Sequence, residues 1–338
     1  MYEDFYRFSA KPFQLTPDPR FFFGSKGHKR AMAYLDYGLS QGEGFIVITG
    51  EVGAGKTTLM RNLFMQLEGS GLVAAQLVST QLDAEDTLRS VSASFGLEHE
   101  GISKSTLLAN LETFLRAATA QGKRALLVVD EAQNLTARAV EELRMLSNFQ
   151  AGERSLMQTF LLGQPEFRGI LQSPDMQQLR QRVVASYHLG PMDAAETRGY
   201  ILHRLGLVGW NNDPAFDEEA FAVVHRFSGG IPRRINTFVD RLLLFGYLEE
   251  KHQLGEAEVD EVMADLRSEV AQQEFTSVAA PGAGASGVAA DGGALMLRLD
   301  ALERTVNRIL PLVRKIHYAV CEPPATPPVE PVAPEAEA

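Results

Sequence analysis

The feature that most constrains the fold of this chain is a glycine-rich segment between two apolar stretches. Residues 50–57 read GEVGAGKT and match the phosphate-cradling pattern G-x-x-x-x-G-K-[ST]. A short run rich in β-branched residues, 45–48, precedes the segment and is typical of a buried strand, and residues 58–63 begin a helical pattern. Because strand, loop and helix signals agree in order, the sequence predicts a phosphate-binding loop (P-loop) at the end of a strand.

Each residue type in this loop has a physical role in holding phosphate. Glycines let the backbone come close to phosphate oxygens, while loop N–H groups and the helix N-terminus face the anion. Lys56 is expected to reach the β- and γ-phosphates, and the Thr57 hydroxyl to ligate Mg²⁺. The predicted nucleotide-binding residues are Gly50, Glu51, Val52, Gly53, Ala54, Gly55, Lys56, Thr57 and Thr58.

An acidic pair at the end of a second apolar run supports this prediction. Residues 125–129 read ALLVV, typical of a strand buried on both faces of a parallel sheet, and Asp130 and Glu131 follow. Carboxylates at the C-terminal ends of such strands face the ligand crevice. We expect Asp130 to hold Mg²⁺ and Glu131 to act as general base toward the attacking water. The alternative is a solvated helix start, since acidic residues favour helix N-termini.

Three further side chains are candidates for the catalytic set. Gln164 follows the run 157–162 and is expected beside the γ-phosphate, although it could simply cap the next helix. Arg233, or secondarily Arg234, opens a helix after Gly-Gly-Ile-Pro and could fold over the phosphates. Arg182 precedes the last predicted strand and could act on the nucleotide of a neighbouring subunit. Both arginine sites could instead be solvated surface residues.

Composition excludes several classes of protein. The chain has 338 residues, with 45% hydrophobic and 22% charged residues, and no apolar run approaches the length of a membrane span. The N-terminus lacks the pattern of a signal peptide, so we expect a cytoplasmic protein. The net charge of −11 argues against broad nucleic-acid binding. A single cysteine, Cys321, excludes an internal disulfide and a cysteine-based zinc site.

Alternating strand and helix patterns predict an α/β fold with a parallel sheet covered on both faces. Expected strands lie near 45–49, 73–78, 125–130, 157–163 and 183–189, and expected helices near 28–40, 57–68, 83–95, 104–120, 136–148 and 165–172. Beyond Asp193 only helical periodicity remains, near 194–206, 217–227, 232–249 and 256–272. We therefore predict an arm at 1–27 packed on the core, a nucleotide-binding domain at 28–192 and an all-helical lid at 193–275.

The C-terminal segment has a different composition. Residues 276–294 are rich in alanine and glycine and predict a flexible linker. Residues 295–320 carry apolar side chains at alternating spacings of four and three, a heptad pattern that contains Pro311, where we expect a kink or break. This helix could self-associate, capture a partner or dock on its own core. Residues 321–338 are rich in Pro and Glu and predict a disordered tail.

Together these motifs resemble a known group of proteins. The P-loop, DEAQ at 130–133, GQPE at 163–166 and GIPR at 230–233 resemble AAA+ ATPases in kind and order. The aromatic and proline-rich opening over 5–22, followed by His28 and YGL at 37–39, is more specific. It is similar to the ExeA/GspA-type general secretion ATPases, and within them most similar to the ATPase of exosortase (PEP-CTERM) and exopolysaccharide loci.

The resemblance implies an AAA+ core with a lid, Mg-ATP binding, homo-oligomers and work at the inner membrane of a bacterium. In that family the Walker lysine and threonine correspond to Lys56 and Thr57, and the acidic pair to Asp130 and Glu131. GspA-type proteins carry a membrane span and a peptidoglycan-binding region after the ATPase. Here a linker, a heptad helix and an acidic tail follow instead, so membrane association is expected to go through a partner.

Three functional hypotheses follow. The leading one is an oligomeric ATPase that powers or regulates assembly of an envelope export or exopolysaccharide system, with partners bound through 295–320. The alternative is an ATPase like the DNA-transposition regulators, in which ATP switches DNA binding. The third is a nucleotide-gated scaffold that hydrolyses slowly and works through the same heptad helix.

Overall fold

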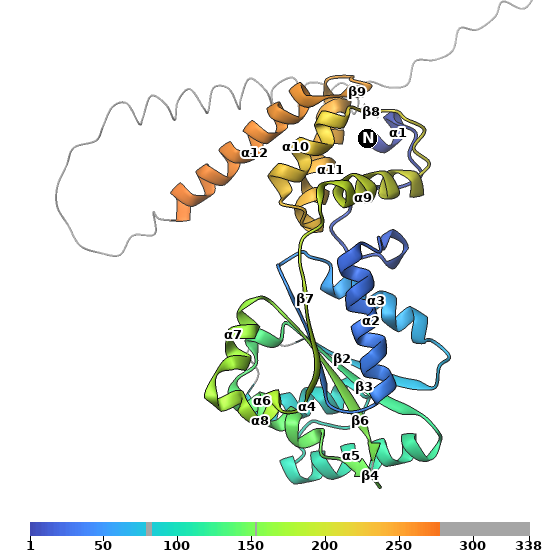
Figure 1. Cartoon of the computed structure of the whole chain (residues 1–338), viewed down its shortest axis with the longest axis vertical. Helices are drawn as coiled ribbons and strands as arrows, with labels where there is room; N and C mark the ends of the chain where they lie inside the picture. The colour runs from blue at the N-terminus through green and yellow to red at the C-terminus, as the bar shows by residue number, and fades with distance from the viewer. Residues whose placement is uncertain (79–82, 153, 278–338) are drawn as a thin grey trace, which may run out of the picture. The chain divides into compact units, whose positions relative to one another are not determined.

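A five-stranded parallel sheet forms the centre of the computed structural model, which describes residues 1–78, 83–152 and 154–277 (Figure 1). The strand order is β2-β3-β6-β1-β7. The strands are β1 (Phe45–Gly50), β2 (Leu72–Val78), β3 (Arg124–Asp130), β6 (Met157–Gly163) and β7 (Val183–Leu189). Strand β1 lies between β6 and β7, since Ile46 pairs with Phe160 on one side and Ala185 on the other. The predicted fold class is confirmed, and all five expected strands are present.

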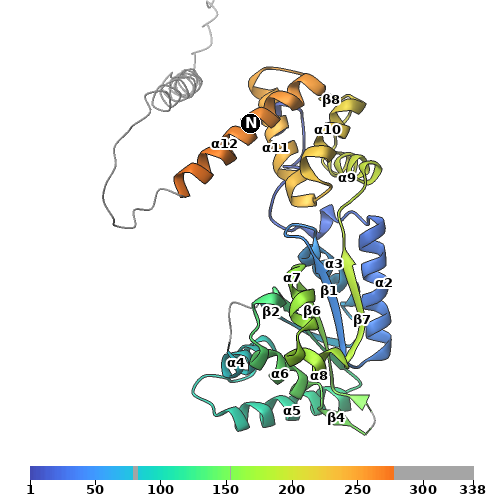
Figure 2. The ribbon, with the colours of Figure 1, turned by 60° about the vertical axis from the view of Figure 1, so that its left-hand side comes forward.

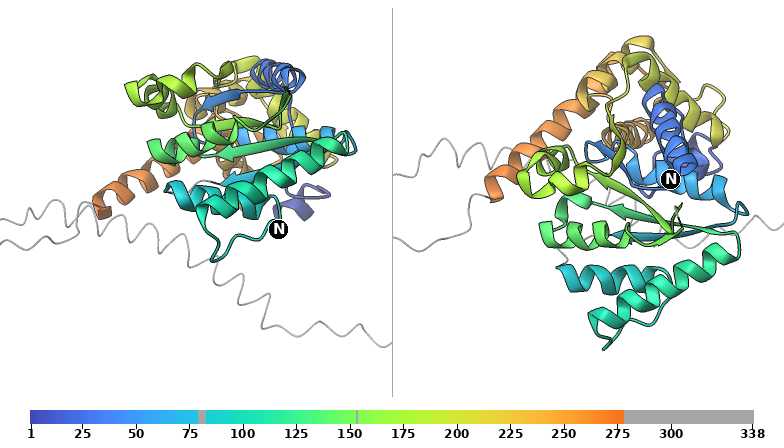
Figure 3. Two further views of the ribbon diagram at one scale, coloured as in Figure 1. Left: turned by 90° about the horizontal axis from the view of Figure 1, so that it is seen from below. Right: turned by 60° about the horizontal axis from the view of Figure 1, so that its bottom comes forward.

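Helices cover both faces of this sheet (Figure 3). Alternate residues of β1 point to opposite faces: Ile46 and Ile48 pack with α2 and α3, while Phe45 and Val47 pack with α4, α5 and α6. All four side chains are buried, which is why the strand is apolar throughout. The helices are α2 (Lys26–Gln41), α3 (Lys56–Leu67), α4 (Ala84–Ser94), α5 (Lys104–Ala120), α6 (Ala137–Leu146), α7 (Glu166–Gln172) and α8 (Gln177–Arg180).

Short polar side chains set where several of these helices begin. The side chains of Ser25, Asp83 and Thr136 each accept a hydrogen bond from a backbone N–H in the first turn of α2, α4 and α6. Helix α2 lies beside the edge strand β7, where the rings of Tyr34 and Tyr187 stack (Figure 2).

The second part of the described chain is helical, as the sequence predicts. It contains α9 (Ala194–Leu207), α10 (Glu218–Ser228), α11 (Pro232–Leu248) and α12 (Glu256–Ser277). Two-residue strands, β8 (Ala215–Phe216) and β9 (Gln253–Leu254), pair in parallel between these helices. A second short pair, β4 (Gln150–Ala151) and β5 (Arg154–Ser155), precedes β6. Neither pair was predicted, because two residues are too few to show a period.

The N-terminal arm packs mostly on the helical part, and its Phe22 also packs against the apolar cluster of α2 and α3. The buried rings of Tyr2, Tyr6, Phe8 and Phe13 belong to one apolar cluster with α9, α10 and α11. The arm contains α1 (Tyr2–Phe5) and a single 3-10 turn, η1 (Pro19–Phe21), and starts beside α11 (Figure 1). The aromatic content predicts burial, but it carries no information on which apolar surface receives the rings.

The boundaries at 27, 192 and 275 remain predictions. Linker residues from 278 onward, the heptad helix 295–320 and the tail 321–338 lie outside the described residues. Within residues 1–78, 83–152 and 154–277, no helix combines the length and apolarity required to cross a bilayer.

Candidate nucleotide-binding site

The phosphate loop connects the end of β1 to the start of α3, as predicted. Gly55 precedes α3 with a left-handed backbone, and among the described residues no side chain caps the first N–H groups of that helix. The Ala54 N–H donates to the Glu51 carbonyl across the loop at 3.1 Å. Uncapped N–H groups at the start of a helix attract anions. Six of the predicted residues line a pocket over the loop: Val52, Gly53, Gly55, Lys56, Thr57 and Thr58.

Lys56 is buried within the loop. Its Nζ donates hydrogen bonds to the carbonyls of Gly50 at 2.7 Å and Glu51 at 3.1 Å. Burial lowers the pKa of the Lys56 ammonium, and the carboxylates of Glu131 and Asp130 oppose that shift. A desolvated ammonium is stabilised strongly by a nearby anion, and a bound phosphate would supply that anion.

Thr57, in the first turn of α3, and Asp130, at the end of β3, lie in hydrogen-bond contact. The Thr57 hydroxyl donates to Asp130 Oδ2 at 3.0 Å, and the Glu131 N–H donates to Oδ1 at 3.0 Å. Burial raises the pKa of the Asp130 carboxyl, and the bond from Thr57 opposes this. A hydroxyl and a carboxylate from two different elements therefore converge, and such oxygen donors are the kind that Mg²⁺ prefers beside a phosphate.

Glu131 lines the same pocket and has an unusual backbone. Its φ of 53° and ψ of 42° are left-handed, a conformation that costs free energy for a residue with a side chain. Burial acts to raise the pKa of Glu131, but hydrogen bonds from Gln133 and Gln164 together with the charge of Lys56 lower it below its ordinary value. The structure thus places the predicted Gln164 against Glu131: its Nε2 donates to Glu131 Oε2 at 3.1 Å. Gln133, to which the sequence analysis assigned no role, is a second contact.

Helix α11 begins directly on the phosphate loop. The Arg233 N–H donates to the Gly53 carbonyl at 3.2 Å, and a side chain at Gly53 would approach Arg233 Cβ to 2.3 Å. Gly53, with φ of 81°, is therefore needed both for the turn and for this close approach. Arg233 and Pro232 line the pocket, and the folding of Arg233 over bound phosphates stays a prediction. Arg234 is exposed and outside the pocket lining.

The N-terminal arm forms the remaining pocket wall. Residues 14–18 and 21–23 line it together with Tyr200, Arg204 and Asn236 of the helical part. The buried Arg204 donates to the Pro12 carbonyl at 2.6 Å and the Tyr200 hydroxyl at 2.7 Å, and its guanidinium lies 4.7 Å from the Phe21 ring centre. No sequence motif pointed to Arg204, because its backbone acceptor Pro12 lies almost two hundred residues away.

His28 supports the loop from α2. Its Nδ1 lies 2.7 Å from the Ser25 hydroxyl, and its Nε2 lies where a side chain at Gly55 would stand. Burial lowers the pKa of His28 to about 4. The ring is therefore neutral near pH 7, and it packs against the loop without adding charge.

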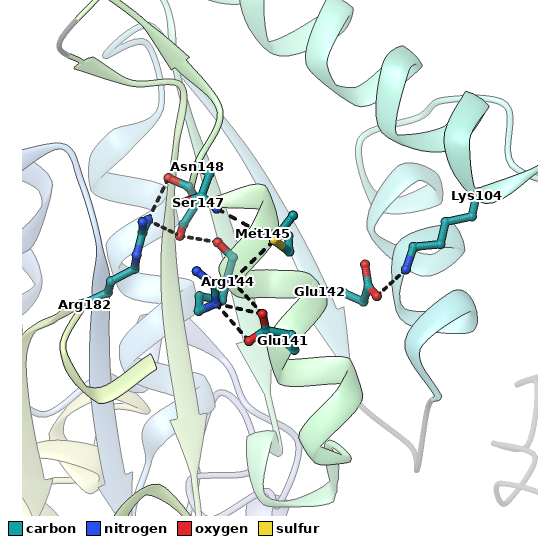
Figure 4. Close-up of polar contacts among 8 residues, drawn as sticks. All are labelled: Lys104, Glu141, Glu142, Arg144, Met145, Ser147, Asn148 and Arg182. Atoms are coloured by element: carbon teal, nitrogen blue, oxygen red, sulfur yellow. Dashed lines mark hydrogen bonds and ion pairs between the residues drawn. The ribbon is translucent and has the colours of Figure 1, made fainter. Parts of the chain in front are cut away.

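Arg182 lies at the N-terminal end of the strands, whereas the phosphate loop lies at their C-terminal end. Its carbonyl accepts from the Phe45 N–H where β1 begins, whereas the loop follows the end of that strand. Its guanidinium donates to Ser147 Oγ at 2.9 Å, next to the Arg144–Glu141 pair at the end of α6 (Figure 4). Six residues of β1 span roughly 20 Å, so Arg182 does not reach the pocket of its own chain.

Comparisons with known proteins agree with this geometry. Residues 39–171 match the family model described as AAA domain. General secretion pathway protein A of Aeromonas hydrophila is 37% identical over 287 residues, covering 84% of this chain and 52% of that protein. The chain therefore spans about half the length of this curated relative.

Solved structures with low sequence identity show the fold. The ORC2 protein of Aeropyrum pernix, solved with ADPNP and ADP, matches with a TM-score of 0.58 at 16% identity, covering 76% of this chain and 71% of that one. Cdc6p of Pyrobaculum aerophilum matches with a TM-score of 0.61 at 14% identity, covering 75% and 70%. Residues 39–171 are therefore an AAA domain of the P-loop fold, in a chain related to general secretion pathway protein A.

Proposed function

We propose that this chain is an Mg²⁺-dependent ATPase that converts ATP and water to ADP and phosphate. The observation that carries the proposal is the arrangement around one pocket of the phosphate loop, the Thr57–Asp130 pair and Glu131. In-line attack of water on a phosphate needs charge neutralisation and a positioned base, and little else from the protein. The AAA domain match supports the assignment.

Binding falls to the loop and the two helices that begin on it. Loop N–H groups and the start of α3 would hold the phosphate oxygens, and Lys56 would add a full charge. Arg233 would add a second cation from α11, whose first turn already contacts Gly53. Thr57 and Asp130 would hold Mg²⁺, which when bound supplies positive charge against the phosphate oxygens.

Glu131 would orient the attacking water and accept its proton, with Gln164 holding the carboxylate or the water. Arg182 would act only from a second copy of the chain, because it lies at the N-terminal end of the strands and its own pocket lies at their C-terminal end. The proposal therefore includes a homo-oligomer in which one subunit completes the site of the next.

In the cell, we propose that the ATPase powers or regulates assembly of a bacterial envelope export or exopolysaccharide system of the exosortase-associated kind. It would work from the cytoplasm, at the inner membrane through partners bound by residues 295–320. The relative named for the general secretion pathway supports an export role. The net charge of −11 gives no support to the DNA-switch alternative.

The enzymatic proposal is tested by ATP turnover against protein concentration, with oligomer size measured in parallel. We expect turnover per subunit to rise as oligomers form, and to collapse in Glu131→Gln and Arg182→Ala. Arg180→Ala is the matched control, since Arg180 is an exposed arginine two residues away. Absence of turnover in the wild type rules out the ATPase. Turnover independent of concentration and of Arg182 rules out the shared site.

The cellular proposal is tested in the source bacterium by replacing the gene with Glu131→Gln or with a chain that lacks residues 277–338. We expect both strains to lose export or polysaccharide product, the second without loss of ATP turnover in the purified protein. Normal product in the Glu131→Gln strain would contradict an ATP-driven role.

A further inference from the structure

Three polar side chains form a hydrogen-bonded ring at the ends of two neighbouring strands. Gln133 Nε2 donates to Glu131 Oε2 at 2.6 Å, and Gln164 Nε2 donates to the same oxygen at 3.1 Å. The Gln164 backbone N–H donates to Gln133 Oε1 at 2.9 Å. Glu131 follows β3 and Gln164 follows β6, so Gln133 connects the ends of both strands through one amide.

The ring defines which way the Gln133 amide faces. Its oxygen must meet the Gln164 N–H and its nitrogen must meet the carboxylate, because the reversed amide would oppose donor to donor and acceptor to acceptor. Gln133 lies in the 3-10 turn η2 (Ala132–Asn134), which follows the left-handed backbone of Glu131. The turn and the amide together hold a strained residue in one conformation.

Within the described residues, both of these donors end on the same carboxylate oxygen of Glu131, Oε2. The second oxygen, Oε1, is then the atom through which Glu131 would accept a proton from water. A carboxylate without these donors could rotate and exchange the two oxygens, and it would be aligned for proton transfer for a smaller fraction of the time.

We propose that Gln133 is a positioning residue that holds the Glu131 carboxylate and the end of β6 in one arrangement, and so sets the rate of hydrolysis rather than the affinity for nucleotide. This inference rests on the proposed ATPase function. Gln133 lies outside the pocket lining, whereas Glu131 lines it. Its effect therefore passes through Glu131.

The test compares Gln133→Leu, which keeps the approximate volume and removes both hydrogen bonds, with the isosteric Gln133→Glu, which opposes two carboxylates. We expect kcat to fall about 10- to 100-fold in Gln133→Leu and further in Gln133→Glu. Affinity for a fluorescent ATP analogue and the unfolding midpoint should stay close to wild type in Gln133→Leu. The exposed Gln178→Leu is the matched control and should keep wild-type kcat.

A double-mutant cycle with Glu131→Gln separates positioning from a structural role. If Gln133 acts through Glu131, adding Gln133→Leu to Glu131→Gln lowers the residual turnover no further. An equal loss in both backgrounds would overturn the inference, as would unchanged or raised kcat in Gln133→Leu. Wild-type protein without turnover would overturn the ATPase proposal and this inference together, whereas an active wild type with an equally active Gln133→Leu overturns this inference alone.

Discussion

The two ends of the pocket are built in opposite ways. The phosphate end comes from contiguous residues between β1 and α3 and from Glu131 after β3, which Gln164 after β6 contacts. The far end comes from the N-terminal arm, α9 and α11, segments separated by almost two hundred residues. Local sequence decides the first end, and long-range packing assembles the second. Substitutions at the phosphate end should therefore change chemistry, whereas those at the far end should change stability.

The largest expected effect is at the phosphate end. Lys56→Ala removes the buried ammonium, and we expect ATP turnover to fall about 1,000-fold because the loss of a preorganised charge near the phosphates has that magnitude. The free energy of unfolding should change little, since Lys56 is desolvated and its hydrogen bonds within the described residues go to two loop carbonyls. Turnover assays and urea unfolding check both parts, with the exposed Lys123→Ala as control. A large drop in the free energy of unfolding of Lys56→Ala would contradict the view that the phosphate end governs chemistry rather than stability.

The far end should behave in the reverse way. Arg204→Ala removes charge-assisted hydrogen bonds to Pro12 and Tyr200, and we expect about 4 kcal/mol of destabilisation from two such bonds and the lost ring contacts. Arg204→Lys should recover part of this, because a lysine keeps the charge but not the planar fork. Urea unfolding is the measurement. Wild-type stability in Arg204→Ala would show that the arm does not depend on this contact.

His28, which packs against the phosphate loop, makes the stability of the fold depend on pH. Its pKa in the folded protein is about 4, below the ordinary 6.5 that the unfolded chain would show. The neutral ring therefore stabilises the fold fully above pH 6.5, and this contribution, about 3 kcal/mol, is lost as pH falls toward 4. The carboxylate of Glu196 acts against burial, because its negative charge raises the pKa of His28.

The unfolding free energies of wild type and His28→Gln, measured from pH 7.5 to 4, isolate this term because the carboxylates common to both proteins cancel. The difference between the two should shrink as pH falls. A difference that stays constant would mean that His28 is not held neutral.

The smallest expected effect lies at the start of the arm. The Tyr2 hydroxyl donates to Asp240 at 2.6 Å, so Tyr2→Phe should cost about 1 kcal/mol while the ring stays buried. The exposed Tyr37→Phe is the control. Thermal unfolding is the measurement, and equal stability of the two variants would show that the ring alone anchors the arm.

Much of the phosphate end could be predicted because its signals are local. The loop pattern, the apolar strand before it and the acidic pair after 125–129 each occupy one short stretch. Parallel pairing of β1 with β6 and of β6 with β3 then places Gln164 beside Glu131. The prediction for Arg182 remains open, because its action depends on a second copy.

Other parts could not be predicted from the same patterns. The burial of the arm was foreseen but not its partner, since apolar rings pack against any available apolar surface. Arg204 and His28 act through contacts that no spacing encodes. A signal for Gln133 did exist: it lies two residues after Glu131, but its amide geometry depends on the end of β6.

By itself the sequence determined the strand-loop-helix unit, the alternation that makes a parallel sheet, and the chemistry available at its C-terminal edge. These depend on backbone freedom and periodic burial over a few residues. Only the tertiary structure decided which cation and which rings close the far end of the pocket. Those contacts join residues distant along the chain, and they form because α9, α11 and the arm each leave an apolar face that must be buried against another.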